Sequence, residues 1–167
     1  EDPLAQLLVR NAFTFEGDAT LRFKGGEYEM TPHVSGTLVK GEPAALARVQ
    51  RSSAHYAQRP DRDYGRYDPT LTSLGGFDTG LAVRRRDGRH WIWSFVNVIQ
   101  SARWETNDIG RLTANDQISG NFDIRYRETV PGKVFRSYWV GARQNNDYNL
   151  GRDRQGSSIN VYSLQTW

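Results

Sequence analysis

Hydrophobic and polar residues alternate along two consecutive runs between Phe13 and Leu38, and the pair Gly25-Gly26 separates the runs. Large apolar residues occupy the odd positions of the first run and the even positions of the second. A period of two predicts extended strands with one apolar and one polar face. The glycine pair supplies the positive φ angles of a tight turn. The sequence therefore predicts a β-hairpin over residues 13–38 whose apolar face is buried.

The remaining chain contains further strand-like segments separated by turn residues. The Asp87-Gly88 pair is typical of a hairpin turn, and Val130-Pro131-Gly132-Lys133 is typical of a type II turn. The strand-like runs are 77–86, 89–100, 117–128, 134–143 and 159–167. The run Trp91–Ile99 is apolar on both faces, which predicts a central strand packed between the sheet and a helix. Residues 144–158 are polar and predict a long loop.

Two short helices are expected beside these strands. Asp2 and Pro3 precede a leucine-rich stretch, which predicts a short N-terminal helix ending near Asn11 at an open end of the sheet. Apolar residues recur at helical spacing over about 43–57 and predict an amphipathic helix lying across one face. The fold class is therefore mainly β: an antiparallel β-barrel or two-sheet sandwich of seven or eight strands. The chain, residues 1–167, is predicted to be a single domain.

Composition narrows the function classes. The 167 residues include no cysteine, so a disulfide framework, a thiolate metal site and a cysteine nucleophile are excluded. No stretch approaches the roughly 18 apolar residues of a membrane helix. The net charge is +3, and all basic residues except Lys24, Lys40 and Lys133 are arginine. Arginine favours acidic partners because its planar fork of donors matches carboxylate, sulfate and phosphate.

A concentration of arginine and aromatic residues near the second half of the chain is the candidate site. Arginine beside exposed aromatic rings suits an acidic sugar chain or a single nucleic-acid strand, through ion pairs and stacking. The predicted ligand-binding residues are Arg125, Arg127, Arg136, Tyr138, Trp139 and Arg143. The alternative is that these residues have only a structural role: the aromatic side chains belong to the core, and the arginines protect a sheet edge from aggregation.

The favoured interpretation is a soluble, non-catalytic binding module that recognises an acidic or carbohydrate ligand. It is expected to be secreted or in the cell envelope. Nucleic acid is not excluded as a partner. No metal and no cofactor are expected, because no ligand spacing or cofactor fingerprint is present. One alternative is a polysaccharide-active enzyme, a lyase or hydrolase, using carboxylates that converge near the first turn: Glu16, Asp18, Glu27 and Glu29.

Two further alternatives are structural. Strands of about ten residues with aromatic residues near their ends are typical of a small outer-membrane β-barrel, with the face of Phe13 and Phe15 against lipid. An open strand edge is typical of a subunit that assembles with copies of itself in a coat, fibre or tube, so a homo-oligomer is a further expected partner state.

Overall fold

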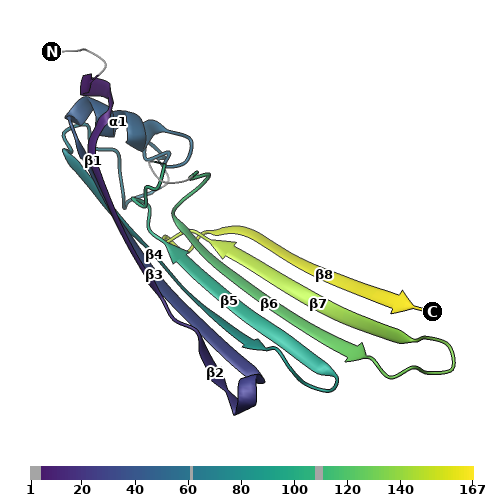
Figure 1. Cartoon of the computed structure of the whole chain (residues 1–167). Coiled ribbons are helices and arrows are strands. Elements are labelled where there is room, and N and C mark those ends of the chain that lie inside the picture. The colour runs from purple at the N-terminus through teal and green to yellow at the C-terminus, as the bar shows by residue number, and fades with distance from the viewer. Residues whose placement is uncertain (1–4, 61, 108–110) are drawn as a thin grey trace.

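The structure is a computed structural model that describes residues 5–60, 62–107 and 111–167 (Figure 1). Within these residues the chain forms eight strands and one α-helix, with two single 3-10 turns. The strands are β1 (Val9–Asp18), β2 (Leu21–Phe23), β3 (Tyr28–Gly41), β4 (Ser73–Arg85), β5 (Trp91–Gln100), β6 (Gln117–Glu128), β7 (Ser137–Tyr148) and β8 (Arg154–Thr166). The helical elements are η1 (Ala5–Leu7), η2 (Lys24–Gly26) and α1 (Pro43–Arg51).

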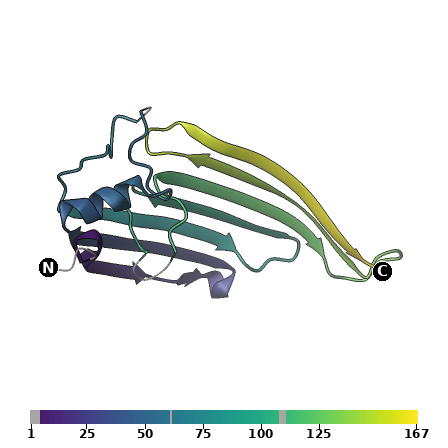
Figure 2. The same ribbon diagram turned by 90° about the horizontal axis from the view of Figure 1, so that it is seen from above.

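All strands belong to one antiparallel sheet in the order β1-β3-β4-β5-β6-β7-β8, and β2 pairs with β3 beyond the end of β1. The mainly β, antiparallel class predicted from the sequence is confirmed. The sheet does not close on itself: β1 and β8 form its two edges, on opposite sides of the molecule (Figures 1 and 2).

The predicted first hairpin is confirmed, including its turn. Phe13 lies opposite Leu38, and Arg22 lies opposite Glu29. The turn needs glycine, because Gly25 has φ 68° and Gly26 has φ 96°. The prediction that the apolar face is buried is wrong for this strand: Phe15 is 65 % exposed, and its neighbour Glu16 on the other face is exposed as well.

The two ends of the sheet differ in the length of their connections. At one end lie η2 and the turns 86–90 and 129–136; at the other lie the long connections 42–72 and 101–116 and the turn 149–153. Figure 1 shows α1 and the long connections gathered at one end, with the short turns far from them.

The small apolar core lies at the long-connection end, where α1 packs on the sheet. Leu46 of α1 is fully buried together with Val39 of β3 and Leu74 of β4. The helix predicted at 43–57 is therefore present but ends at Arg51, and its buried Leu46 packs with Val39 of β3 and Leu74 of β4. In the part of the chain that the structure describes, no helix is long and apolar enough to cross a membrane.

Three other expectations need correction. The N-terminal helix is reduced to the 3-10 turn η1, because β1 already begins at Val9; residues 1–4 of that prediction lie outside the described residues. The double-sided burial expected for β5 is absent, since Trp91 and Phe95 are exposed. The loop predicted over 144–158 is mostly strand, because β7 continues to Tyr148 and β8 begins at Arg154.

Candidate functional site

The sheet has one apolar and one polar face along its whole width. Register assigns every strand residue to a face, because residues directly opposite each other share a side. We define the apolar face by the residues Phe13, Phe15, Leu21, Phe23, Tyr28, Met30, Val34, Leu38, Phe77, Leu81, Val83, Trp91, Trp93, Phe95, Ile99, Ile118, Phe122, Ile124, Tyr126, Tyr138, Val140, Ile159 and Val161. The opposite, polar face carries mainly charged, amide and hydroxyl side chains.

Much of the apolar face is exposed. The phenylalanines at six of its positions are each 40–65 % exposed. At roughly 200 Å² for one aromatic side chain, these six alone present on the order of 600 Å². This already reaches the size of the largest apolar patch on a typical soluble monomer. At the β8 edge the exposure rises further, to 73 % for Ile159 and 77 % for Val161.

Aromatic rings gather on the apolar face near the short turns. The ring of Tyr126 packs edge-on against Trp91, with centroids 5.2 Å apart, and lies 6.2 Å from Tyr138. Across β4, the rings of Tyr28 on β3 and Trp93 on β5 are 6.3 Å apart. The apolar face therefore ends in a row of amphipathic rings that crosses several strands.

The polar face contains a carboxylate surrounded by arginines near the short turns. The Glu29 side chain is only 8 % exposed. Arg86 Nη1 donates to Glu29 Oε2 at 2.7 Å, Arg22 Nε donates to the same oxygen at 3.2 Å, and Arg84 lies 3.6 Å from Glu29 Oε1. One carboxylate thus faces three cations, which leaves this part of the polar face positively charged.

A second cluster surrounds Asp123 at the centre of the polar face. Arg143 Nε donates to Asp123 Oδ2 at 3.0 Å, and Arg125 lies 3.8 Å from Oδ1. The Tyr162 hydroxyl donates to the same Asp123 carboxylate. The Arg125 guanidinium stacks over Trp139 at 4.8 Å and over Tyr162 at 5.7 Å. Asp123 thus receives two arginines and one phenol.

Gly141 makes room for this cluster. A Cβ at that position would lie 2.5 Å from the Tyr162 ring. The aromatic ring therefore occupies the space of the missing side chain, and this places the hydroxyl on Asp123.

The six residues predicted to bind a ligand fall into three places. Arg125, Arg127, Trp139 and Arg143 share the polar face. Tyr138 lies on the apolar face, and the exposed Arg136 lies in the turn before β7. The structure therefore brings four of the predicted residues together and separates two.

The carboxylates considered for paired-acid chemistry are spread along the first strands. Glu16 lies opposite Ser35, which is six residues from Glu29 along β3, a separation of about 20 Å. Glu27 is bound by Arg85 at 2.7 Å. Glycosidase carboxylates lie closer than about 10 Å. Glu16 and Glu29 therefore lie too far apart for such a pair.

The long connections form a buried polar cluster over one end of the polar face. The His55 Nε2 lies 2.7 Å from Glu105 Oε2, and both side chains are almost fully buried. Asn115 Nδ2 lies 2.6 Å from His55 Nδ1. A proton on Nε2 therefore satisfies all three groups, since the ring then donates to Glu105 and accepts from Asn115.

Hydrogen bonding sets the ionisation of Glu105 in this cluster. Burial is the largest single influence and raises the pKa of the Glu105 carboxyl, but the hydrogen bonds from His55 and from the Asn107 amide outweigh it. The pKa of Glu105 is therefore lower than its ordinary value. The Glu105 amide also donates to Thr37 of the polar face at 3.2 Å, which attaches the 101–116 connection to the sheet.

A second buried ion pair joins the two long connections beside the turn 149–153. Arg62 Nη1 donates to Asp116 Oδ2 at 2.8 Å, and the Tyr64 hydroxyl donates to the same oxygen at 2.9 Å. Burial and the hydrogen bond to Asp116 raise the pKa of Tyr64. The Gly151 amide donates to the Tyr64 hydroxyl, so these segments form one covering layer.

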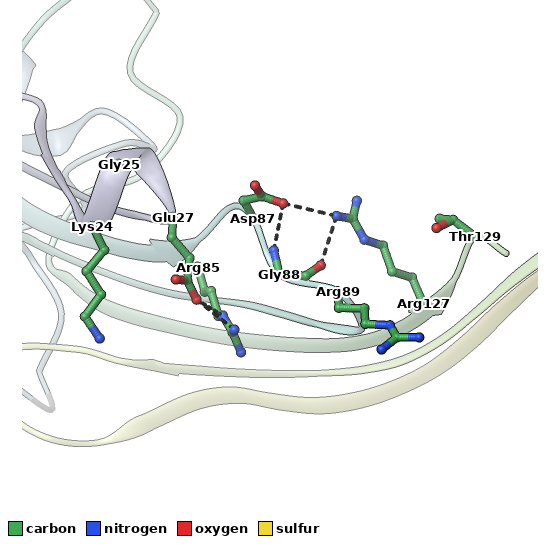
Figure 3. Close-up of a pocket in the computed structure, with 9 residues that line it drawn as sticks. All are labelled: Lys24, Gly25, Glu27, Arg85, Asp87, Gly88, Arg89, Arg127 and Thr129. Atoms are coloured by element: carbon green, nitrogen blue, oxygen red, sulfur yellow. Dashed lines mark hydrogen bonds and ion pairs between the residues drawn. The ribbon is translucent and has the colours of Figure 1, made fainter.

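A cavity of about 530 Å³ opens at the short-turn end (Figure 3). It lies between η2 and the turn 86–90. Its lining residues are Lys24, Gly25, Glu27, Arg85, Asp87, Gly88, Arg89, Arg127 and Thr129. Of the predicted site residues only Arg127 lines it. Sequence reasoning missed this cavity, because its residues come from three separate turns that meet only in the folded sheet.

These features define an antiparallel β protein built on one open sheet with an apolar and a polar face. The long connections cover one end of the polar face. The chain belongs to the family described as a domain of unknown function, DUF5916, whose model matches residues 42–165. That range includes α1 and β4 to β8. Neither a curated protein nor a solved structure matches the chain.

Proposed function

We propose that this sheet is part of the wall of a β-barrel in a bacterial outer membrane, with the apolar face against lipid and the polar face toward the barrel interior. The observation that carries the proposal is the continuous apolar face, exposed from β1 to β8, opposite a hydrogen-bonded polar face. Lipid-facing and interior-facing residues alternate in this way along membrane strands.

The height of the apolar face fits a bilayer. On β3 it extends from Tyr28 to Leu38, ten residue steps. At about 3.4 Å a step this is about 34 Å along the strand, or about 26 Å across a membrane at a tilt near 40°. The apolar band of outer-membrane barrels is about 25 Å tall.

The ends of the strands support the same arrangement. Membrane barrels have short turns on one side, long loops on the other, and aromatic rings at the membrane interfaces. Here the short turns adjoin the ring row around Tyr126, while the connections 42–72 and 101–116 lie at the opposite end. In the proposed barrel those long connections fold over the interior at one opening.

Strand direction limits how the barrel closes. Each antiparallel pairing reverses direction, and β8 occupies the seventh position counted from β1. The two edge strands therefore run in the same direction, and pairing them directly would create a parallel contact. An all-antiparallel barrel needs an odd number of additional strands, from further chain or from another subunit.

Extraction and vesicle insertion test this proposal. The protein should sediment with membranes, require detergent for extraction, and show a heat-dependent shift in gel mobility. Release from membranes by salt or carbonate, with unchanged mobility after heating, would refute the membrane assignment.

The second candidate function is recognition of an acidic or carbohydrate ligand on the polar face. It is favoured by the stacking of Arg125 on Trp139, with Arg127 and Arg143 on the same face. Titration with acidic and neutral glycans and oligonucleotides at two salt concentrations tests it. Salt-sensitive binding lost in Arg125→Gln supports it, whereas binding indifferent to salt removes its electrostatic basis.

A further inference from the structure

The short-turn cavity contains more cations than carboxylates. Lys24, Arg85, Arg89 and Arg127 line it together with only two acids. Arg85 binds Glu27 at 2.7 Å, and Arg127 lies 3.6 Å from Asp87. Among residues 5–60, 62–107 and 111–167, no carboxylate forms an ion pair with Lys24 or Arg89. The cavity therefore carries a net charge of +2 (four cations minus two anions).

Lys24, Arg85 and Arg89 form a row of cations along the cavity. Figure 3 shows the Arg85 guanidinium between the Lys24 ammonium at one end and the Arg89 guanidinium at the other, while Asp87 and the Gly88 carbonyl hold the Arg127 guanidinium on the opposite side of the turns. Lys24 and Arg89 form no salt bridge with a carboxylate of the described residues, although Arg89 interacts electrostatically with the Glu128 carboxylate. Three cations in a row are suited to a phosphate, because arginine can bind phosphate oxygens with two parallel hydrogen bonds.

The cavity lies where the apolar face ends. Arg85 is opposite both Tyr28 and Trp93, so its backbone position belongs to the apolar face. The Lys24 ammonium lies 5.4 Å from the Tyr28 ring centroid, and the Arg85 guanidinium lies 5.8 Å from it. The cations therefore lie just beyond the aromatic row, at the level that lipid headgroups occupy in the proposed membrane orientation.

We propose that this cavity binds an anionic lipid headgroup, with its phosphate on the central Arg85 and on the cations to either side of it, Lys24 and Arg89. This inference rests on the proposed membrane function. The volume suits the polar part of a lipid, since ligand pockets measure about 300–1,000 Å³, and the acyl chains would continue along the apolar face.

Native mass spectrometry of the detergent-purified protein tests the site, with phosphatidylglycerol as the probe and phosphatidylcholine as the neutral comparison. The double variant Lys24→Gln/Arg89→Gln should bind phosphatidylglycerol at least tenfold more weakly than the wild type. The charge-preserving variant Lys24→Arg/Arg89→Lys should retain most of the affinity. The matched control, Arg152→Gln/Arg154→Gln, removes the same charge at the far end of the sheet and should bind as the wild type does.

The outcomes separate this inference from the proposed function. Equal binding of both lipids, or equal loss in the double variant and the control, overturns the site. Inorganic phosphate that binds the wild type as tightly as phosphatidylglycerol does overturns the lipid assignment. Insertion into vesicles is measured in parallel: a wild type that fails to insert overturns the membrane proposal, whereas insertion without an effect of the double variant overturns only the headgroup site.

Discussion

Two neighbouring residues on the central strand β5 give a direct test of which face meets lipid. Phe95 lies on the apolar face opposite Phe122, and Val96 lies on the polar face opposite Asn121. The two residues share the same depth in the sheet and differ only in the side to which they point. Phe95→Arg and Val96→Arg therefore form a matched pair that places one charge on either face.

The expected magnitude follows from the position of Phe95. It is four residues from Trp91 and five from Gln100, about 14–17 Å along the strand, and so close to the centre of the proposed apolar band. An arginine facing lipid at that depth destabilises a membrane barrel by about 2–4 kcal/mol, a change of about 30- to 700-fold in the folding equilibrium. Val96→Arg should cost only about 1 kcal/mol, because its side chain stays on the face of Asn121 and Ala82, away from lipid, and loses only its packing there.

Reversible urea unfolding from lipid vesicles, followed by tryptophan fluorescence, measures both variants. In water the order would reverse: Phe95 is 40 % exposed, so a surface arginine there would change stability little, whereas Val96→Arg would lose the same packing as it does in lipid. A Phe95→Arg protein as stable as the wild type, and more stable than Val96→Arg, would refute the lipid-facing assignment.

Two further predictions concern the polar face and its cover. Gly141→Ala should swing the Tyr162 ring off its carboxylate partner and lower the free energy of unfolding by about 1–3 kcal/mol, measured by urea unfolding. The lowered pKa of Glu105 should make the cover acid-sensitive: its stabilisation is complete above the ordinary value near pH 4.5 and is lost as pH falls through the lower folded pKa. The protection factors of the 101–105 amides, which correct exchange for its intrinsic pH dependence, should therefore fall in acid in the wild type, while Glu105→Gln should lack this response and already show lower protection at neutral pH.

Each of these predictions has a control nearby. Gly120→Ala on β6 adds a Cβ whose nearest neighbour is 3.9 Å away, and should leave stability unchanged or slightly increased. Glu16→Gln removes an exposed carboxylate on the same face and should leave the acid response of the cover intact. If Gly120→Ala destabilises as much as Gly141→Ala, crowding of the Tyr162 ring is not the cause.

Local pattern was sufficient to predict the strands that alternate between apolar and polar residues, because period-two alternation and turn glycines act within a few residues. The Asp87-Gly88 turn and the first hairpin lie where they were predicted. Polar strands were missed, since Asn145 and Asn146 have low strand propensity. They are held in β7 by partners across the β7–β8 hairpin: Asn145 donates to Ser158 at 2.9 Å, and Ser157 donates to Asn146 at 3.0 Å.

The environment of the apolar face was harder to predict than the strands. The alternation of apolar and polar residues is the same whether that face packs on a core or meets another apolar environment. The assumption of a buried core led to the expectation that Phe15 is dry, which the structure contradicts. The short-turn cavity also required the fold, since Lys24 and Arg89 are 65 residues apart in the sequence and line one cavity only through the pairing of β3 with β4. The composition predicted that arginine side chains bind an acidic partner, but it did not show where in the fold those arginines gather.

The open edge at β8 gives the last test of the barrel proposal. β8 has 13 residues, and in a strand paired on one side about half of the N–H and C=O groups, roughly six of each, point to the free edge. Each such group left unpaired in hydrocarbon costs several kcal/mol, so a bilayer requires a further strand beside Ile159 and Val161. In vesicles, the amides of residues 159–163 should all be protected from hydrogen exchange, as those of the doubly paired β5 are. Alternate amides that exchange as fast as those of an unstructured peptide would show an edge in water, and the apolar face beside it would then not be embedded in lipid.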